Sequence, residues 1–277
     1  MAYKDILVHV DNSASSPARL NASIRVAKEW GAKLTGLYVL SRPYLPAYAE
    51  AQISADILET QAKESEKVAE RAKDSFTAAT QSNGLNANWR VVENGTADAL
   101  AVQSRYFDLV VAGQENPKDE FFIAGSEMPD RTILISGRPA LLIPYIGDCE
   151  TIGENVMIAW DGSRQASRAV HDAMPVLEDA KNVTVMVINP KDKGNGSGKE
   201  PGAGVVRHLA EHGIKATAEH VTTDLDPGNM LLSRASDKGI DLIIMGAYGH
   251  ARWTELVLGG VTKHMLQHMT VPVLMSH

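Results

Sequence analysis

The sequence contains the same pattern of segments twice, and this repeat constrains the fold more than any other feature. Three pairs of segments align: KDILVHVDNS (4–13) with ENVMIAWDGS (154–163), FDLVVAG (107–113) with IDLIIMG (240–246), and RPALLIP (138–144) with VPVLMSH (271–277). The first pair places Asp11 opposite Asp161. A repeat of this length indicates two copies of one structural unit. We therefore predict two similar domains, residues 1–147 and 152–277, joined by the polar, glycine-containing segment 145–153.

Composition narrows the class of protein. The chain has 277 residues, so each half is long enough to bury a core of its own. A formal net charge of −7 argues against nucleic acid and anionic membranes as partners. No apolar run approaches the length of a membrane span, and charged residues interrupt the start of the chain where a signal peptide would be apolar. The single cysteine, Cys149, excludes a disulfide within the chain. We expect a cytoplasmic protein.

Short apolar runs without polar alternation predict strands that are buried on both faces, as in a parallel sheet. These runs are residues 6–10, 34–40, 109–112, 156–160, 183–188 and 242–245. Amphipathic helices are predicted between them. The helix after Asp226 illustrates the pattern, because Asp226 is a suitable N-cap, Pro227 suits the first helical position and Gly239 ends the segment. Each half thus alternates strand and helix, which predicts an α/β fold with a doubly wound parallel sheet.

A glycine-rich loop follows the predicted strand 242–245. Gly246 and Gly249 are two residues apart, and nine residues separate Gly249 from Gly259, where a helix is predicted to begin. Glycines let the backbone approach an anion closely, and a helix N-terminus offers free N–H groups to phosphate. The spacing matches neither the dinucleotide motif GxGxxG nor the Walker motif GxxxxGK[ST]. A plain connection between strand and helix remains the alternative.

With this loop the chain resembles the universal stress protein family in its tandem two-domain form. The nucleotide-binding branch of that family carries G-2x-G-9x-G-[S/T] after its fourth strand. This sequence matches the three glycines and departs at the last position, where Gly260 replaces Ser or Thr. The resemblance implies that each domain is an open five-stranded parallel sheet with helices on both faces, Rossmann-like and of the adenine-nucleotide α-hydrolase type. It also implies ATP, with or without Mg²⁺, at the carboxyl ends of the strands.

Carried over residue by residue, the resemblance implies a nucleotide site in the second half. Ala159 and Asp161 would flank the adenosine, and Val187 would meet the adenine through its backbone. The remaining implied contacts, to the ribose and phosphates, are Met245, Gly246, Gly249, Gly259, Gly260, Val261 and Thr262. His250 lies inside the glycine loop and is placed to offset phosphate charge, although a solvated loop residue is an equal alternative. Because Gly260 stands in place of Ser or Thr, the site lacks a hydroxyl whose hydrogen bond to a charged phosphate would contribute about 1.5–3 kcal/mol to the binding free energy. Nucleotide binding in this half is therefore expected to be weakened but retained.

The first half keeps only part of this pattern. Gly113 is present, Asn116 stands at the second glycine position, and Gly125 and Ser126 form a Gly-Ser pair one residue short of the expected spacing. We expect this degenerate site to bind nucleotide poorly or not at all.

Acidic residues strengthen that expectation. Asp119 and Glu120 fall inside the loop, where a carboxylate would repel a phosphate. Asp11 and Val39 are retained at the ends of the first two predicted strands. The first half is therefore expected to be structural or to bind something else.

Several residues have plainer interpretations. Asp11 and Asp161 would also suit as helix caps. His264 and His268, like His208 and His212, lie four residues apart, but no third ligand is evident, so we predict no metal site. His9 lies on a predicted strand. It is expected to be an interior histidine whose ring nitrogens have hydrogen-bond partners, and not a catalytic residue.

Three functions remain open at this point. The first is a stress-response regulator or sensor that binds an adenine nucleotide in its C-terminal domain and is read by a protein partner. The second is a protein-interaction module of the same family without a nucleotide. The third is a slow ATPase, although no residue is evident as a base for water, so we assign no catalytic residue. The resemblance also implies pairing along the last strands of the two halves, within one chain or in a homodimer of chains.

Overall fold

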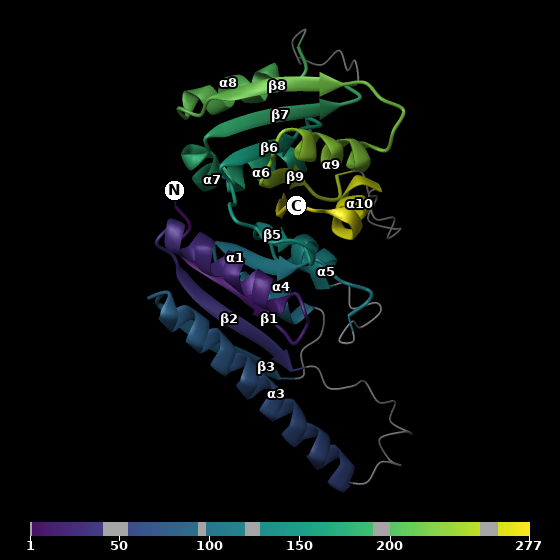
Figure 1. The fold of residues 1–277 in the computed structure, drawn as a ribbon. Coiled ribbons are helices and arrows are strands. Elements are labelled where there is room, and N and C mark those ends of the chain that lie inside the picture. The colour runs from purple at the N-terminus through teal and green to yellow at the C-terminus, as the bar shows by residue number, and fades with distance from the viewer. Residues whose placement is uncertain (1, 41–54, 94–97, 120–127, 191–199, 250–259) are drawn as a thin grey trace.

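The computed structural model describes residues 2–40, 55–93, 98–119, 128–190, 200–249 and 260–277. These residues form an α/β fold with one β-sheet (Figure 1). The strands are β1 (Asp5–Val10), β2 (Lys33–Leu40), β3 (Ala87–Glu93), β4 (Leu109–Gly113), β5 (Ala140–Ile143), β6 (Asn155–Ala159), β7 (Asn182–Ile188), β8 (Ala216–Val221), β9 (Leu242–Gly246) and β10 (Val273–Ser276). The helices are α1 (Ser16–Glu29), α3 (Ala55–Ser82), α4 (Asp98–Ser104), α5 (Met128–Ile135), α6 (Arg164–Asp172), α7 (Met174–Asp179), α8 (Ala203–Glu211), α9 (Pro227–Asp237) and α10 (Gly260–His268).

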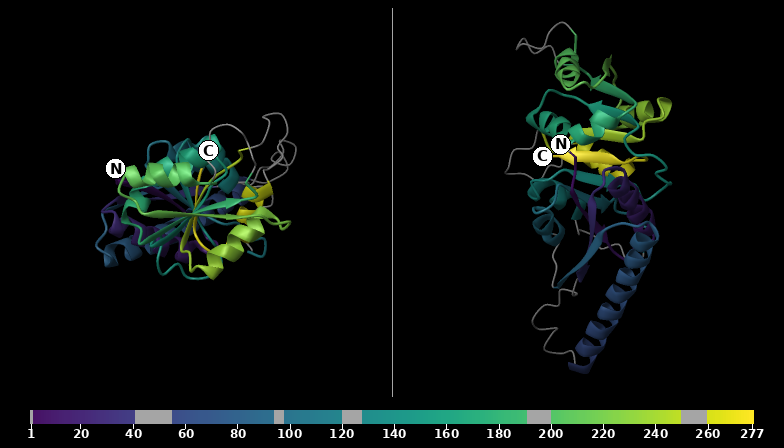
Figure 2. Two further views of the ribbon diagram at one scale, coloured as in Figure 1. Left: turned by 90° about the horizontal axis from the view of Figure 1, so that it is seen from above. Right: turned by 90° about the vertical axis from the view of Figure 1, so that its left-hand side faces the viewer.

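The two halves share a single ten-stranded sheet. Its strand order is β3-β2-β1-β4-β5-β10-β9-β6-β7-β8, and within each half every paired strand is parallel to its neighbour. The halves meet where β10 pairs with β5 in the antiparallel direction, with Leu274 opposite Leu141. The predicted α/β alternation and five parallel strands per half are confirmed. The last strands pair within one chain, so the sheet runs without a break from one half to the other (Figure 2).

Helices cover both faces of the sheet, as expected for strands that are apolar along their whole length. On one face Ile24 of α1, Phe76 of α3 and Leu209 of α8 join a core that spans both halves. On the other face Ile133 of α5 and Met265 of α10 join a second core that also spans both halves. The junction is thus packed on both sides of the sheet.

The predicted N-cap of α9 is confirmed, whereas α1 and α6 begin after Ser15 and Ser163 and not after Asp11 and Asp161. The Asp226 carboxylate accepts hydrogen bonds from the N–H groups of Gly228 and Asn229, and so caps α9. Helix α6 ends at Asp172 and α7 begins at Met174, with Pro175 in the first turn of α7. None of the described helices is both long enough and apolar enough to cross a membrane.

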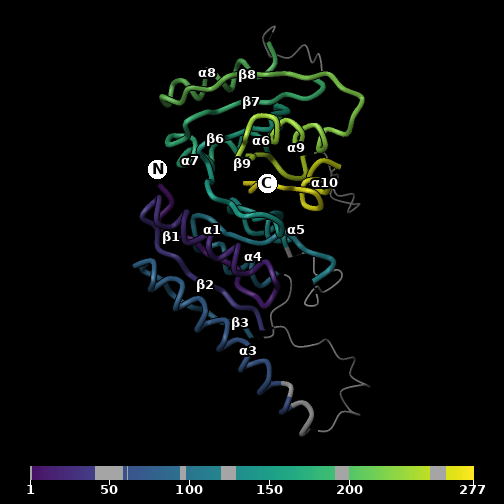
Figure 3. The backbone as a smooth tube through the Cα atoms, viewed as in Figure 1, coloured from purple at the N-terminus to yellow at the C-terminus, as the bar shows by residue number. Residues whose placement is uncertain are grey.

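The two chain ends lie near the junction of the halves (Figure 3). Tyr3 fixes the N-terminal segment there, because its hydroxyl donates a hydrogen bond of 2.5 Å to the carbonyl of Asp172 at the end of α6. Burial and the nearby carboxylates of Asp172 and Asp108 raise the pKa of this phenol far above its ordinary value. The contact therefore ties the start of the first half to the second.

Candidate functional site

The carboxyl ends of neighbouring strands bring the predicted residues of the second half together. Ala159 ends β6 and lies in register with Met245 on β9, which is followed by Gly246. Val187 lies on β7, the neighbour of β6 on its other side. These four residues share one edge of the sheet, where ligands of doubly wound folds are bound.

The two described ends of the glycine loop meet at this edge. The N–H of Tyr248 donates a hydrogen bond of 3.2 Å to the hydroxyl oxygen of Thr262 in the first turn of α10. Thr262 is only 4% exposed, so its side chain lies in the interior. Gly260 begins α10 with Val261 after it, while His250 and Gly259 lie outside the described residues. The hydroxyl of Thr262 thus holds the loop to the helix.

Packing gives Gly246 a structural role of its own. A Cβ atom at this position would lie 2.4 Å from the backbone nitrogen of Ala166 and 2.4 Å from the carbonyl carbon of Gln165. The start of α6 therefore rests directly on the end of β9. Gly249 is different, because a Cβ atom there would have Oε1 of Gln165 as its nearest neighbour, at an ordinary 3.6 Å. At Gly260, no atom of the described part of the chain lies within 4 Å of such a Cβ, so the position is sterically open with respect to those residues.

Asp161 lies in the turn that leads into α6. Its Oδ1 accepts a hydrogen bond of 2.9 Å from the N–H of Ser163. The helix cap is Ser163 itself, whose hydroxyl oxygen accepts from the N–H of Ala166. Asp161 thus shapes the turn between β6 and α6 and does not cap the helix.

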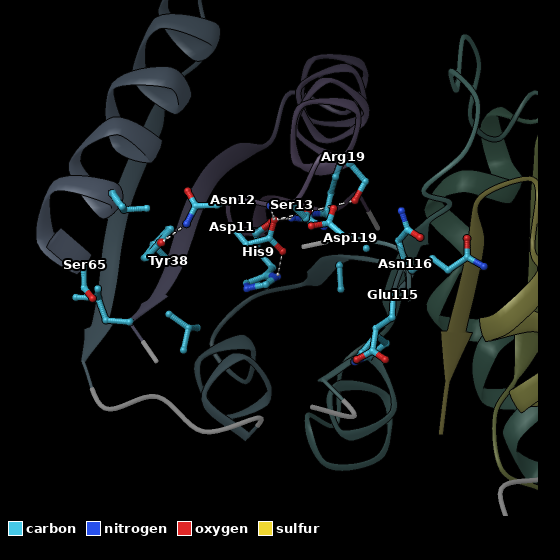
Figure 4. Close-up of a pocket in the computed structure, with 18 of the residues that line it drawn as sticks. His9, Asp11, Asn12, Ser13, Arg19, Tyr38, Ser65, Glu115, Asn116 and Asp119 are labelled. Carbon is cyan, nitrogen blue, oxygen red and sulfur yellow. Dashed lines mark hydrogen bonds and ion pairs between the residues drawn. The ribbon is translucent and has the colours of Figure 1, made fainter. Parts of the chain in front are cut away.

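The corresponding edge of the first half holds a cavity of about 430 Å³ (Figure 4). It lies at the carboxyl ends of β1, β2 and β4, and one side is formed by α3. Two of the predicted first-half residues, Asp11 and Val39, line it, and so does Gly113. Gly125 and Ser126 lie outside the described residues.

An ion pair between the buried Arg19 and the partly exposed Asp11 forms the floor of this cavity. Arg19, which is 3% exposed, places Nη2 at 2.7 Å from Oδ1 of Asp11 and donates from Nε to the backbone carbonyl of His9. Burial alone raises the pKa of the Asp11 carboxyl. Arg19, His9 and the hydrogen bond from Ser13 outweigh that effect and hold this pKa well below its ordinary value. Asp11 is therefore ionised across the ordinary pH range.

His9 lies beside this pair and is 8% exposed. Burial lowers its pKa to about 4, although Asp11 partly opposes the shift, so the imidazole is neutral near pH 7. Its Nδ1 is 3.6 Å from Oδ2 of Asp11, which is longer than a hydrogen bond. The side chain of His9 makes no hydrogen bond with any other described residue. It is therefore interior as predicted, and its ring borders the cavity without a hydrogen bond to another described residue.

Arg19 also explains why Gly113 is a glycine. A Cβ atom on Gly113 would lie 2.1 Å from Nη1 of Arg19, so the guanidinium occupies the space beside the end of β4. The residue that corresponds to Arg19 in the repeat is Ala169, which has no charge. The two halves thus differ in the chemistry at the same edge.

Asp119 lies over the start of α1 in the first half. Its Oδ2 accepts a hydrogen bond of 2.8 Å from the N–H of Ala14, just before the helix. The carboxylate therefore binds a backbone donor of the kind that a phosphate would use. Asn116 lines the same cavity, and its Oδ1 accepts from the N–H of Lys118.

Sequence reasoning missed His9, Arg19 and Tyr38 as members of one site. An arginine directly beside the apolar face of a helix, eight residues after Asp11, was the available signal. This pattern indicates that the arginine is buried, but it does not show which residue the guanidinium pairs with. The two histidine pairs are close in space: the ring centroids of His264 and His268 are 4.6 Å apart, and those of His208 and His212 are 4.9 Å apart. In the described ranges, no group of three or more His, Cys, Asp or Glu side chains is arranged to hold a metal ion.

Comparison with known proteins gives a family. The model of the family described as "Universal stress protein family" matches twice, over residues 2–126 and 153–277. A universal stress protein of Synechocystis sp. is 25% identical over 173 residues, which are 61% of this chain and 57% of the relative. One of Methanocaldococcus jannaschii is 38% identical over 48 residues, 17% of this chain and 30% of the relative. The matched segments thus span 57% of the length of the first relative and 30% of the second.

Solved structures agree on the fold. The chain resembles a universal stress protein of Archaeoglobus fulgidus with a TM-score of 0.74 at 14% identity, covering 98% of this chain and 97% of the other. A functionally unknown protein of Pseudomonas aeruginosa gives a TM-score of 0.58 at 13% identity, covering 99% and 92% of the two chains. Since the family model covers both halves and the fold agrees with it, the chain belongs to the Universal stress protein family, as a tandem of two family domains.

Proposed function

We propose that the protein is a stress-response regulator whose second half binds an adenine nucleotide, ATP with or without Mg²⁺. Occupancy of this site would bias a surface that a protein partner reads. The residues assigned to this site lie at the carboxyl edge of β6, β7 and β9 and around the glycine loop: Ala159, Asp161, Val187, Met245, Gly246, Gly249, Gly260, Val261 and Thr262. The other residues of the loop, His250 and Gly259, belong to the proposal from the sequence motif alone.

One observation carries this proposal. The hydrogen bond from Tyr248 to Thr262 brings the start of the glycine loop and the N-terminus of α10 to the same end of β9. A helix N-terminus carries a partial positive charge and free N–H groups, which favour phosphate. Gly260 opens that helix, and no atom of the described residues lies within 4 Å of a Cβ placed there, which favours access of an anion to the backbone donors.

The sterically open position of Gly260 also supplies the test. Gly260→Ser restores a hydroxyl of the family motif, and we expect ATP to bind about 10- to 100-fold more tightly. Gly260→Asp fits the same space and suits a helix N-terminus, but places a carboxylate beside the phosphates, so we expect it to weaken ATP binding. Calorimetric titration of nucleotide-stripped protein measures both. Equal ATP affinity in the two variants would contradict the proposal.

A protein-interaction module without nucleotide is the second candidate. The packing of Gly246 against α6 favours it, because this glycine would be needed even if no phosphate were bound. In that case neither Gly260 variant would respond to ATP, and a wild-type chain would show no thermal shift at millimolar ATP. Slow ATP hydrolysis is a third option, which phosphate release that depends on Asp161 or Thr262 would identify.

A further inference from the structure

We propose that the first half positions the glycine loop of the second half, through the hydrogen bond between Asp130 and Tyr248. Asp130 is then a positioning residue for the nucleotide, and the ATP affinity of the second half depends on the first. The inference rests on the proposed nucleotide site and adds a route by which one half controls the other. It follows from a strained residue in the loop, from the contacts that fix its backbone and from the helix that supports it across the junction.

Tyr248 adopts an unfavourable backbone conformation. It lies between Gly246 and Gly249, and its φ is +59°, in the left-handed region that glycine adopts readily and other residues adopt at a cost. Gly249 follows directly, so this dihedral angle sets the direction in which the glycine loop continues. A residue other than glycine stays in this region only where the surrounding contacts enforce it.

Three polar contacts fix the peptide that leads into Tyr248. The N–H of Ala247 donates a hydrogen bond of 2.9 Å to the carbonyl of Ser276, and the carbonyl oxygen of Ala247 lies 3.0 Å from Nδ1 of His277. The N–H of Tyr248 donates to the hydroxyl oxygen of Thr262. None of these three contacts restrains rotation about the N–Cα bond of Tyr248, so the side chain must supply that restraint.

The side chain of Tyr248 supplies it by reaching into the first half. Tyr248 is 6% exposed and belongs to the second core, which spans both halves. Its phenol donates a hydrogen bond of 2.5 Å to Oδ1 of Asp130 on α5. Rotation of Tyr248 to a negative φ would swing the ring away from Asp130, because Cβ turns about the N–Cα bond together with the backbone that follows. The bond to Asp130 therefore opposes relaxation of the loop.

Helix α5 anchors this contact in the first half. It lies at the junction, against β10 of the second half (Figure 1). Ile133 of α5 is 1% exposed and packs in the same core as Tyr248. Arg131, next to Asp130, donates from Nη2 to Oδ2 of Asp98 at the start of α4, over 2.9 Å. Asp130 is thus held by its own half while it restrains the loop of the other.

The repeat shows that this contact is not common to the two halves. The alignment of residues 107–113 with 240–246, continued along the chain, pairs Glu115 with Tyr248 and Asp130 with Lys263. A phenol and its acceptor carboxylate are therefore available in one direction only, from the loop of the second half to α5 of the first. The loop of the second half is the one that depends on its neighbour.

Coupling of this kind acts in both directions. If the bond to Asp130 favours the loop conformation that binds ATP, ATP must favour the bond by the same factor. Occupancy of the nucleotide site is then transmitted to α5. Pro129, in the first turn of that helix, lines the cavity of the first half, so the signal reaches the corresponding edge of the other half.

The test measures ATP affinity by calorimetric titration of the nucleotide-stripped full chain in the presence of Mg²⁺. We expect Tyr248→Phe and Asp130→Ala each to weaken ATP binding about five- to tenfold. The double variant should bind ATP no more weakly than the weaker of the two single variants, because both changes remove the same contact. Asp130→Asn keeps an oxygen that can accept from the phenol, so it should retain most of the affinity.

Tyr3→Phe is the matched control. It also removes a tyrosine hydroxyl that donates a hydrogen bond of 2.5 Å between the halves, to the carbonyl of Asp172. That contact lies at the end of α6, whereas the nucleotide site is at its start, so we expect the ATP affinity of the wild-type chain. Urea denaturation of each variant verifies that the chain is folded under the conditions of the titration.

Three results would overturn the inference, and they differ in what they say of the nucleotide site. Wild-type affinity in both Tyr248→Phe and Asp130→Ala would leave that site in place and remove the coupling. Equal losses in Tyr3→Phe and Tyr248→Phe would show that any weakening of the junction lowers ATP affinity, without a specific role for Asp130. Absence of ATP binding by the wild-type chain would remove the nucleotide site and this inference with it.

Discussion

The phenol of Tyr248 in the second half donates a hydrogen bond of 2.5 Å to the Asp130 carboxylate on α5 of the first half. Tyr248 lies between Gly246 and Gly249, and its φ of +59° places it in the left-handed region that side chains rarely adopt. Asp130 follows Pro129, which lines the cavity of the first half. One hydrogen bond therefore connects the two candidate sites across the junction.

Removal of this phenol should destabilise the junction. We expect Tyr248→Phe to lower the free energy of unfolding by about 1.5–3 kcal/mol, because a hydrogen bond to a charged group is lost. Urea denaturation of Tyr248→Phe, Asp130→Ala and the double variant forms a mutant cycle. The double variant should be less destabilised than the sum of the two single variants. Strict additivity would mean that the two side chains do not interact in solution.

Gly246 and Gly260 should respond to alanine in opposite ways. Gly246→Ala forces a Cβ against the backbone of α6, and we expect a loss of about 1–3 kcal/mol or more in unfolding free energy. Gly260→Ala meets no atom within 4 Å among the residues that the structure describes and replaces a glycine in a helix, so the stability of this variant should be unchanged or slightly higher. Thermal unfolding of the two variants measures the contrast. A neutral Gly246→Ala would show that α6 does not rest on β9.

His9 should make stability depend on pH. Its pKa in the folded chain is about 4, below the ordinary value of 6.5, so the unfolded chain binds the additional proton between these values. Stability is therefore complete above pH 6.5 and falls as the pH drops towards 4, by about 3 kcal/mol from this group. Asp11, with its lowered pKa, adds a further loss only below the ordinary aspartate range. Urea midpoints across this window should slope less in His9→Gln, and an unchanged slope would mean that His9 is not buried in its neutral form.

The ion pair of Asp11 and Arg19 should be costly to break on one side. Arg19→Met leaves the Asp11 carboxylate without its guanidinium, and we expect a loss of about 1.5–3 kcal/mol in unfolding free energy, because Asp11 is 33% exposed and water partly replaces the lost partner. The double variant Asp11→Asn, Arg19→Met removes both charges and should recover part of that loss. Chemical denaturation compares the three chains. A double variant less stable than Arg19→Met would show that Asp11 does not depend on this partner.

The fold was predictable because its signals are local and repeated. The six apolar runs placed β1, β2, β4, β6, β7 and β9 within one or two residues, and Asp226 with Pro227 placed the start of α9. These strands and this helix start each depend on residues close to them in the chain, so the amino-acid sequence is sufficient to predict them. The residues at the carboxyl edge of β6, β7 and β9 were instead implied by the resemblance to the universal stress protein family.

The details of the two sites were not predictable, because they depend on side chains far apart in the sequence. Tyr248 and Asp130 are 118 residues apart, and no local pattern pairs them. Thr262 was expected to offer its hydroxyl to phosphate, whereas the structure places that oxygen against the N–H of Tyr248. The contact of Arg19 with Gly113 likewise depends on how α1 packs on β4. Whether Thr262 also binds a nucleotide stays a prediction.

The stoichiometry of ATP binding to nucleotide-stripped protein tests the central claim most directly. Calorimetric titration with Mg²⁺ should give one site per chain, with higher affinity in Gly260→Ser and lower affinity in Gly260→Asp. That result would place the nucleotide at the N-terminus of α10, in the second half. Two sites per chain, or a single site that is indifferent to residue 260, would contradict a nucleotide site in the second half alone, and so would the absence of heat at millimolar ATP.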